Sequence, residues 1–177
     1  MLEKRTATQQ IYKGRVVSLK VDTVVMPSGR VTTREVVERP DTVGMLALDE
    51  RHNVLLVRQF RYAIGHETLE IPAGTIDTGE TPQQAAVREL REETGYDPGR
   101  LELLLEYGPA IGYCTERMTI FLAHDLRPSP LKGDEERIRL VRMPFDDAYQ
   151  AILSGKGLFE DAKSTLAILL ARTRGLA

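Results

Sequence analysis

The sequence predicts an α/β fold in which helices cover a β-sheet. Strand-like apolar runs and helix-like segments follow one another in mixed order along the 177 residues, and this order is typical of a sheet covered by helices. The composition, 42% hydrophobic and 28% charged, is ordinary for a globular protein. A chain of this length suits one domain with a small extension. We expect an N-terminal β-hairpin segment at residues 1–41 and the main domain at residues 42–177.

The N-terminal segment is predicted to contain two strands. Residues 14–25 alternate apolar and polar side chains, which is typical of a strand. Residues 27–30 (PSGR) favour a turn, and residues 31–39 are expected to return as the second strand. The hairpin has few large apolar side chains, so it must pack on something else to be stable.

Short apolar runs and well-marked helix ends predict the elements of the main domain. Turn residues separate the strands, and proline and glycine end the third of them. One helix begins at a proline and ends at Ser-Gly, as helices commonly do. We expect strands at residues 42–48, 53–60, 68–74, 100–108, 117–124 and 137–143, and helices at about residues 82–93, 144–155 and 161–174.

Charge and cysteine content exclude several classes of protein. The net charge is −2 and the pI about 6.0, which argues against nonspecific binding to nucleic acid or to anionic membranes. No apolar run approaches the roughly 18 residues of a membrane span, and the first ten residues have no apolar signal-peptide core. The single cysteine, Cys114, can neither form an internal disulfide nor anchor zinc alone. We therefore expect a cytoplasmic protein.

The helix at residues 82–93 has clear limits. Thr81 is a favourable N-cap, Pro82 suits the first helical position, and Gln84 stands where a capping box requires it. Gly95 lies where a left-handed terminator is common. The apolar side chains expected to pack inward are Ala86, Val87 and Leu90.

Three glutamates lie close together on this helix, and their negative charges call for a compensating cation. Glu89 and Glu93 stack along one edge of the apolar face, Glu92 lies beside them, and Arg88 is one turn before Glu92. Neighbouring, partly desolvated carboxylates have raised pKa values unless a cation compensates. Carboxylate oxygens suit Mg²⁺ or Mn²⁺, and such ions suit phosphate substrates. Taken alone, RELREE is also typical of a solvated, salt-bridged helix face.

The residues around this helix resemble the signature of the Nudix hydrolases. The matching positions are Gly74, Glu80, Arg88, Glu89, Leu90, Glu92, Glu93, Gly95 and Tyr96. Further segments, among them VLLVRQFRYAIGHETLEIPAG and DAKSTLAILLA, resemble the ADP-ribose pyrophosphatase branch of that family. The resemblance implies an α/β/α sandwich around a mixed sheet, with an N-terminal antiparallel strand pair.

The resemblance also implies roles for the residues of the box. The metal ligands would be Glu89 and Glu93, assisted by Glu92 and the backbone carbonyl of Ala73. Arg88 would orient the carboxylates, and Glu80 would brace the preceding loop. The cofactor would be Mg²⁺ or Mn²⁺.

Outside the box, we expect a general base and several substrate contacts. Glu116, in GYCTE, would be the general base, although an ordinary surface glutamate also fits its position. Arg61 and Arg58 are candidates for contact with phosphate, because a guanidinium group matches its geometry. The resemblance implies that Glu70 helps to define the substrate pocket. A solvated strand residue is the alternative for each arginine, and a structural ion pair is the alternative for Glu70.

The implied reaction is hydrolysis of a nucleoside diphosphate derivative. ADP-ribose, giving AMP and ribose 5-phosphate, is the leading substrate, and another nucleotide sugar or FAD is the alternative. Ile111 stands where the branch usually has proline, which leaves the substrate open. A different class of function is a sensor that binds such a nucleotide without cleaving it. The resemblance also implies a homodimer in which the N-terminal segment reaches the partner.

Overall fold

The structure, a computed structural model, describes residues 2–131 and 138–177 of the chain. Its internal contacts define two compact units. The first unit consists of Met1–Asp41 and Tyr107–Met118, and the second consists of Thr42–Glu106 and Thr119–Ala177. The division into domains at residues 1–41 and 42–177 stays a prediction, because contacts within one chain do not show which segment folds alone.

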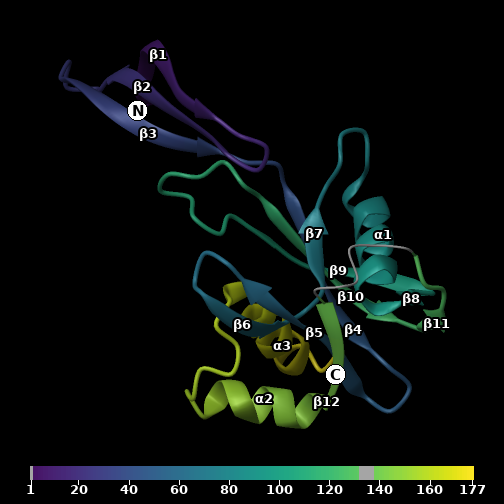
Figure 1. Cartoon of the computed structure of the whole chain (residues 1–177). Coiled ribbons are helices and arrows are strands. Elements are labelled where there is room, and N and C mark those ends of the chain that lie inside the picture. Colours follow the sequence, from purple (N-terminus) through teal and green to yellow (C-terminus); the bar gives the residue numbers. More distant parts are fainter. Residues whose placement is uncertain (1, 132–137) are drawn as a thin grey trace. The chain divides into compact units, whose positions relative to one another are not determined.

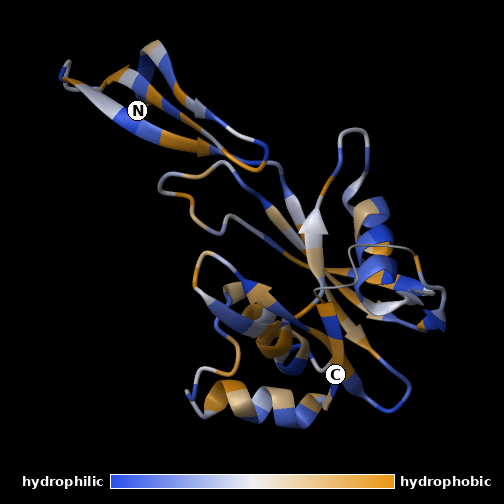
Figure 2. Cartoon of the chain, viewed as in Figure 1, coloured by the Kyte–Doolittle hydropathy of each residue, from blue (hydrophilic) through white to orange (hydrophobic). Residues whose placement is uncertain are grey.

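The first unit contains a three-stranded antiparallel sheet. Its strands are β1 (Lys4–Lys13), β2 (Ser18–Val25) and β3 (Val31–Glu38), in the order β1-β2-β3. The predicted pairing of β2 with β3 is confirmed, and Val25 lies opposite Val31 beside the turn. β1 was not predicted, because all ten of its residues are exposed and most of them are polar. Figure 2 shows hydrophilic and hydrophobic residues alternating along these strands.

The second unit is built on a seven-stranded sheet with the strand order β12-β5-β4-β10-β9, in which β6 also pairs with β5 and β7 with β4 (Figure 1). Two further two-residue strands, β8 (Tyr96–Asp97) and β11 (Arg127–Pro128), pair with each other. The strands of the main sheet are β4 (Thr42–Leu48), β5 (Asn53–Arg61), β6 (His66–Glu70), β7 (Ala73–Thr75), β9 (Arg100–Tyr107), β10 (Met118–His124) and β12 (Ile138–Pro144). For the predicted strand 137–143, Arg137 lies outside the described residues.

The predicted strand at residues 68–74 forms two strands instead of one. β6 pairs with β5 and β7 pairs with β4, so the chain changes its partner strand between them. Pro72 lies at the change, and a proline has no N–H to continue a ladder. Its carbonyl accepts a hydrogen bond from the Met45 N–H at 2.9 Å. The switch brings Gly74 and the following loop to the edge of β4.

Helices cover both faces of the sheet. They are α1 (Pro82–Thr94), α2 (Phe145–Leu153) and α3 (Ala162–Thr173). Every residue of β4 is buried, and alternate residues of a strand point to opposite faces. Val43, Met45 and Ala47 join one core cluster with Ala85, Ala86 and Leu90 of α1. α3 also packs on β4 and therefore covers the opposite face.

This arrangement confirms the predicted fold class, with β1 as an additional N-terminal strand. Of the side chains expected to point inward from α1, Ala86 and Leu90 are fully buried, whereas Val87 is half-buried and Ala85 is buried in addition. Figure 2 shows α1 as mostly hydrophilic on the side in view, while α2 and α3 carry more hydrophobic residues. No helix within residues 2–131 and 138–177 is long and apolar enough to cross a membrane.

Candidate active site

The start and end of α1 fix the position of its glutamates. The Thr81 side chain accepts from the Gln84 N–H, and the Gln84 side chain accepts from the Thr81 N–H at 2.8 Å, which completes the predicted capping box. Pro82 occupies the first turn, and Gly95 ends the helix with φ 79° in the left-handed region. The helix therefore has a fixed register, and Glu89 and Glu93 stack one turn apart, next to the buried face.

Arg88 links three carboxylates of the site. Its Nε and Nη2 donate to Glu80 at 2.9 and 2.8 Å, and its Nη1 donates to Glu89 at 2.7 Å. The predicted i,i+4 pair with Glu92 is present at 3.3 Å. Nη2 also donates to the Thr75 carbonyl at 2.9 Å, so the guanidinium ties the loop before α1 to the helix. This geometry suits the orienting role predicted for Arg88.

Glu80 braces the loop between β7 and α1. Besides its bonds to Arg88, its carboxylate accepts from the Asp77 N–H at 3.1 Å. The hydrogen bonds from Arg88 lower the pKa of Glu80 to about 2. Glu80 therefore stays ionised and Arg88 stays paired throughout the neutral pH range.

The Glu89 carboxylate packs directly over the backbone of Gly74. A Cβ atom at Gly74 would lie 1.8 Å from the Glu89 carboxyl carbon and 2.1 Å from each of its oxygens. Any side chain at this position would displace the carboxylate. Burial raises the pKa of Glu89, and the hydrogen bond from Arg88 opposes this effect.

Glu93 lies deeper than Glu89, beside β7. Its Oε2 accepts from the Ala73 N–H at 2.9 Å. Burial raises the pKa of Glu93 to about 8, and the nearby charge of Glu89 adds to the rise. The prediction of raised pKa values for these two carboxylates is thus confirmed.

The donor set fits a hard divalent cation. Glu89 and Glu93 are one turn apart on α1 in partly buried positions, and the charge of Glu89 acts on Glu93. Carboxylate oxygens are the ligands that Mg²⁺ and Mn²⁺ prefer. A bound cation would favour their ionised forms, which burial opposes. Within the described residues no three His, Cys, Asp or Glu side chains already surround a common point. The assignment of Glu89, Glu93, Glu92 and the Ala73 carbonyl as metal ligands stays a prediction.

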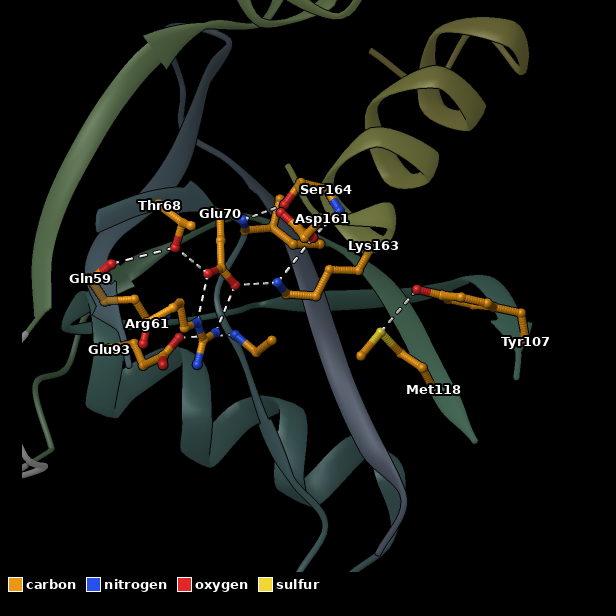
Figure 3. A network of polar contacts seen from close by, with 12 residues as sticks. Gln59, Arg61, Thr68, Glu70, Glu93, Tyr107, Met118, Asp161, Lys163 and Ser164 are labelled. Atoms are coloured by element: carbon orange, nitrogen blue, oxygen red, sulfur yellow. Dashed lines mark hydrogen bonds and ion pairs between the residues drawn. The ribbon is translucent and has the colours of Figure 1, made fainter. Parts of the chain in front are cut away.

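A largely buried polar network lies near Glu93 (Figure 3). The Nε and Nη2 of Arg61 each donate to Glu70 at 2.7 Å, in a bidentate pair. Thr68 and Lys163 donate to the same carboxylate. Burial alone raises the pKa of Glu70, but the hydrogen bonds from Arg61 and the charge of Lys163 outweigh it and lower the pKa to about 2.

The sequence interpretation did not include the α3 side of this network. Lys163 is buried and also donates to Asp161 at 3.0 Å. Asp161 caps α3 by accepting from the Ser164 N–H at 2.8 Å, and the Ser164 hydroxyl accepts from the Ile71 N–H at 2.9 Å. A lysine in the first turn of a mostly apolar helix was the available signal, since a buried lysine nearly always has a partner.

Arg58 does not join the network of Arg61. It lines a separate surface hollow together with Lys156 and Glu160, and it lies opposite Leu69 in the β5–β6 register. Arg58 and Arg61 are three positions apart on one strand, so they point to opposite faces. Contact of either arginine with phosphate stays a prediction.

Glu116 belongs to the first unit. Its side chain is buried, with 8% of its surface exposed, and it accepts from Arg39 Nη1 at 3.2 Å. Hydrogen bonds from the Val37 N–H to the Tyr113 carbonyl and from the Thr115 N–H to the Val37 carbonyl hold the preceding loop against β3. The alternative that Glu116 is an ordinary surface glutamate is therefore wrong. Its role as a general base stays a prediction.

Comparison with known proteins places the chain in a family. The NUDIX domain family model matches residues 38–165, and the model of the nucleoside diphosphate sugar hydrolase N-terminal domain matches residues 3–37. A methanol dehydrogenase activator from Bacillus methanolicus is 33% identical over 169 residues, covering 94% of this chain and 90% of that protein. An ADP-ribose pyrophosphatase from Bacillus subtilis is 34% identical over 169 residues, with coverage of 94% and 90%. The crystal structure of an ADP compounds hydrolase matches with a TM-score of 0.89 at 26% identity, covering 100% of this chain and 97% of that chain.

The fold and the acidic helix define a hydrolase of pyrophosphate bonds. The chain belongs to the Nudix family, and the predicted resemblance is confirmed. It is a Nudix pyrophosphatase that acts on nucleoside diphosphate derivatives. Members of this family typically require a divalent metal ion.

Proposed function

We propose that this protein hydrolyses ADP-ribose to AMP and ribose 5-phosphate, with Mg²⁺ or Mn²⁺ as the cofactor. The observation that carries the proposal is the partly buried pair of Glu89 and Glu93, of which Glu93 lies near the guanidinium of Arg61 (Figure 3). Two carboxylates that can bind a divalent cation, near an arginine with N–H groups free to bind phosphate oxygens, are suited to binding a diphosphate. A relative named ADP-ribose pyrophosphatase supports this substrate. Another nucleotide sugar or FAD is the alternative, and a relative that is 32% identical over 154 residues is named GDP-mannose pyrophosphatase.

The residues of the chain divide the chemical work. A divalent cation, when bound, neutralises the diphosphate and stabilises charge on the departing phosphate. Glu89, Glu93 and Glu92, with the Ala73 carbonyl, would hold it, and Arg88 keeps the carboxylates of Glu89 and Glu92 in place. Arg61 binds a phosphate oxygen through its remaining N–H groups. Glu116 takes the proton of the attacking water.

A substrate panel tests the proposal. ADP-ribose, other nucleotide sugars and FAD are incubated with Mg²⁺ or Mn²⁺, and the products are analysed after reaction in ¹⁸O-labelled water. We expect AMP and ribose 5-phosphate from ADP-ribose, with label in only one of them. A protein that is inert toward all nucleoside diphosphate derivatives would contradict the proposal.

The variant Glu93→Gln tests the ligand assignment. We expect turnover to fall by roughly 100-fold or more while the fold is retained, because the amide keeps the size of the side chain but removes its charge. Circular dichroism checks the fold. An unchanged rate would refute the assignment of Glu93 as a metal ligand.

A further inference from the structure

The carboxylate of Glu70 has all of its acceptor positions filled by the protein. Oε1 accepts from Arg61 Nε and Thr68, and Oε2 accepts from Arg61 Nη2 and Lys163 (Figure 3). A carboxylate offers about four lone-pair sites, so four donors saturate it. Glu70 therefore has no acceptor left for a substrate hydroxyl, and its action must pass through the groups that it holds.

Arg61 is the solvent-exposed member of this network. Its side chain is 42% exposed, whereas the side chains of Glu70 and Lys163 are 4% and 9% exposed. Glu70 occupies Nε and one N–H of Nη2, and Nη1 donates to no other group among the described residues. The edge formed by Nη1 and Nη2 thus offers a second pair of parallel N–H donors, and this pair matches two oxygens of a phosphate group.

Lys163 is the buried cation on the other side of the Glu70 carboxylate. It enters from α3, while Glu70 and Arg61 belong to β6 and β5, so the lysine ties the helix layer to the sheet at this carboxylate. Asp161 holds the ammonium group in turn, and the two cations and two carboxylates of the network balance in charge. Removing Lys163 would take away one of the four hydrogen bonds to Glu70 and its link to α3, so the Glu70 carboxylate and the Arg61 guanidinium that it holds would be less firmly oriented.

We propose that Lys163 is a positioning residue that fixes the Glu70 carboxylate, so that Arg61 presents its open edge to the diphosphate of the substrate. The inference rests on the proposed function for the identity of the substrate. It concerns the orientation of one guanidinium, which is measurable without any substrate.

The first test is steady-state kinetics of Lys163→Met with the diphosphate substrate that the wild-type protein hydrolyses fastest. We expect KM to rise roughly 10-fold with little change in kcat, because a uniform binding contact is weakened. In an Arg61→Met background the same change should add almost nothing, since Lys163 acts through Arg61. Full additivity of the two substitutions, or an unchanged KM in Lys163→Met, would overturn the proposal.

Ser164→Ala is the matched control. Ser164 is the next residue on α3 and is fully buried, and its hydroxyl accepts from the N–H of Ile71, the residue after Glu70. In the part of the chain that the structure describes, it makes no hydrogen bond to Arg61 or Glu70. We expect this variant to melt at a lower temperature while keeping its KM. If both variants raise KM alike, the effect of Lys163 is merely structural and the proposal fails.

Asp161→Asn serves as a milder variant in case Lys163→Met does not fold. Asparagine is as good an N-cap as aspartate but does not carry the charge that holds Lys163. We expect a smaller rise in KM in the same direction, and an unchanged KM would speak against the proposal.

A spectroscopic readout separates this inference from the proposed function. The Nε–H of Arg61, bonded to Glu70, should give a resonance in the ¹⁵N spectrum that exchanges slowly with solvent. Lys163→Met should speed that exchange at least several-fold, and Lys163→Arg should restore part of the protection. A wild-type protein without pyrophosphatase activity would sink the proposed function and leave this readout intact. An Arg61 signal that is identical in all three proteins would overturn the role of Lys163.

Discussion

Gly74 shows how one missing side chain shapes the site. The Glu89 carboxylate occupies the space in which a Cβ atom would stand. The sequence identified Gly74 only as a position of the family signature, because a close approach between residues 15 positions apart depends on the tertiary fold. We therefore expect Gly74→Ala to affect activity far more than stability.

The predicted outcome for Gly74→Ala is a loss of roughly 100-fold in kcat/KM, since a displacement of about 1 Å in a catalytic group has effects of that size. The Glu89 side chain can move, so the melting temperature should change little. Gly44→Ala is the matched control: Gly44 lies on β4 opposite Ala73, and a Cβ there would have ordinary contacts of 3.4 Å or more. A Gly74→Ala protein with wild-type kinetics would contradict the placement of Glu89.

The carboxylate of Glu70 predicts a specific loss of stability in acid. Its pKa is about 2 in the folded protein against an ordinary value of 4.5. A group with a lowered folded pKa stabilises the fold above the unfolded value, and this contribution is lost as the pH falls through the folded one. The shift corresponds to about 3 kcal/mol in the free energy of unfolding.

Denaturant titrations of the wild type and Glu70→Gln, at pH 6 and at pH 2, measure this contribution. We expect the wild type to be the more stable protein at pH 6, and the difference to shrink by about 3 kcal/mol at pH 2. The contributions of other acidic groups, such as Glu80, to the free energy of unfolding cancel in this comparison, because those groups titrate in both proteins. A difference that does not depend on pH would show that Glu70 is not ionised in the folded state.

At the scale of elements, the sequence predicts best where local chemistry sets the boundaries. α1 begins and ends as predicted because Thr81, Gln84 and Gly95 act within one turn of the helix. The sequence does not predict the break between β6 and β7, because the break arises where the chain changes its partner strand from β5 to β4. The pattern of apolar and polar residues along a strand does not show which strands pair with it. The Lys163 contact joins residues 93 positions apart, so no local pattern indicates it.

The capping box of α1 gives a prediction for this element. Thr81→Ala removes the side chain that accepts from the Gln84 N–H, and it should destabilise the protein by about 1 kcal/mol. Thermal melting with circular dichroism measures the change. Thr78→Ala, at an exposed position in the same loop, is the control and should be close to neutral. Equal melting temperatures for Thr81→Ala and the wild type would mean that the cap contributes nothing.

At the scale of the whole molecule, the prediction of a dimer rests on the exposed apolar side chains of the first unit. Ile11, Tyr12 and Val31 are exposed to 49%, 56% and 62%, on or beside strands that form a sheet of only three members. A small sheet of this kind gains stability when another surface covers its apolar side chains. We retain the prediction that a second copy of the chain supplies that surface, in a two-fold homodimer.

Light scattering coupled to size exclusion tests the dimer at micromolar concentration. We expect twice the mass of the 19.9 kDa chain, and we expect Ile11→Lys to shift the equilibrium toward the monomer, because a charge would be buried at the interface. Leu153→Lys introduces the same charge at a side chain of α2 that is 57% exposed, and should leave the mass unchanged. A wild-type protein that is monomeric and fully active would show that the site is complete within one chain. The apolar residues of the N-terminal sheet would then need another explanation.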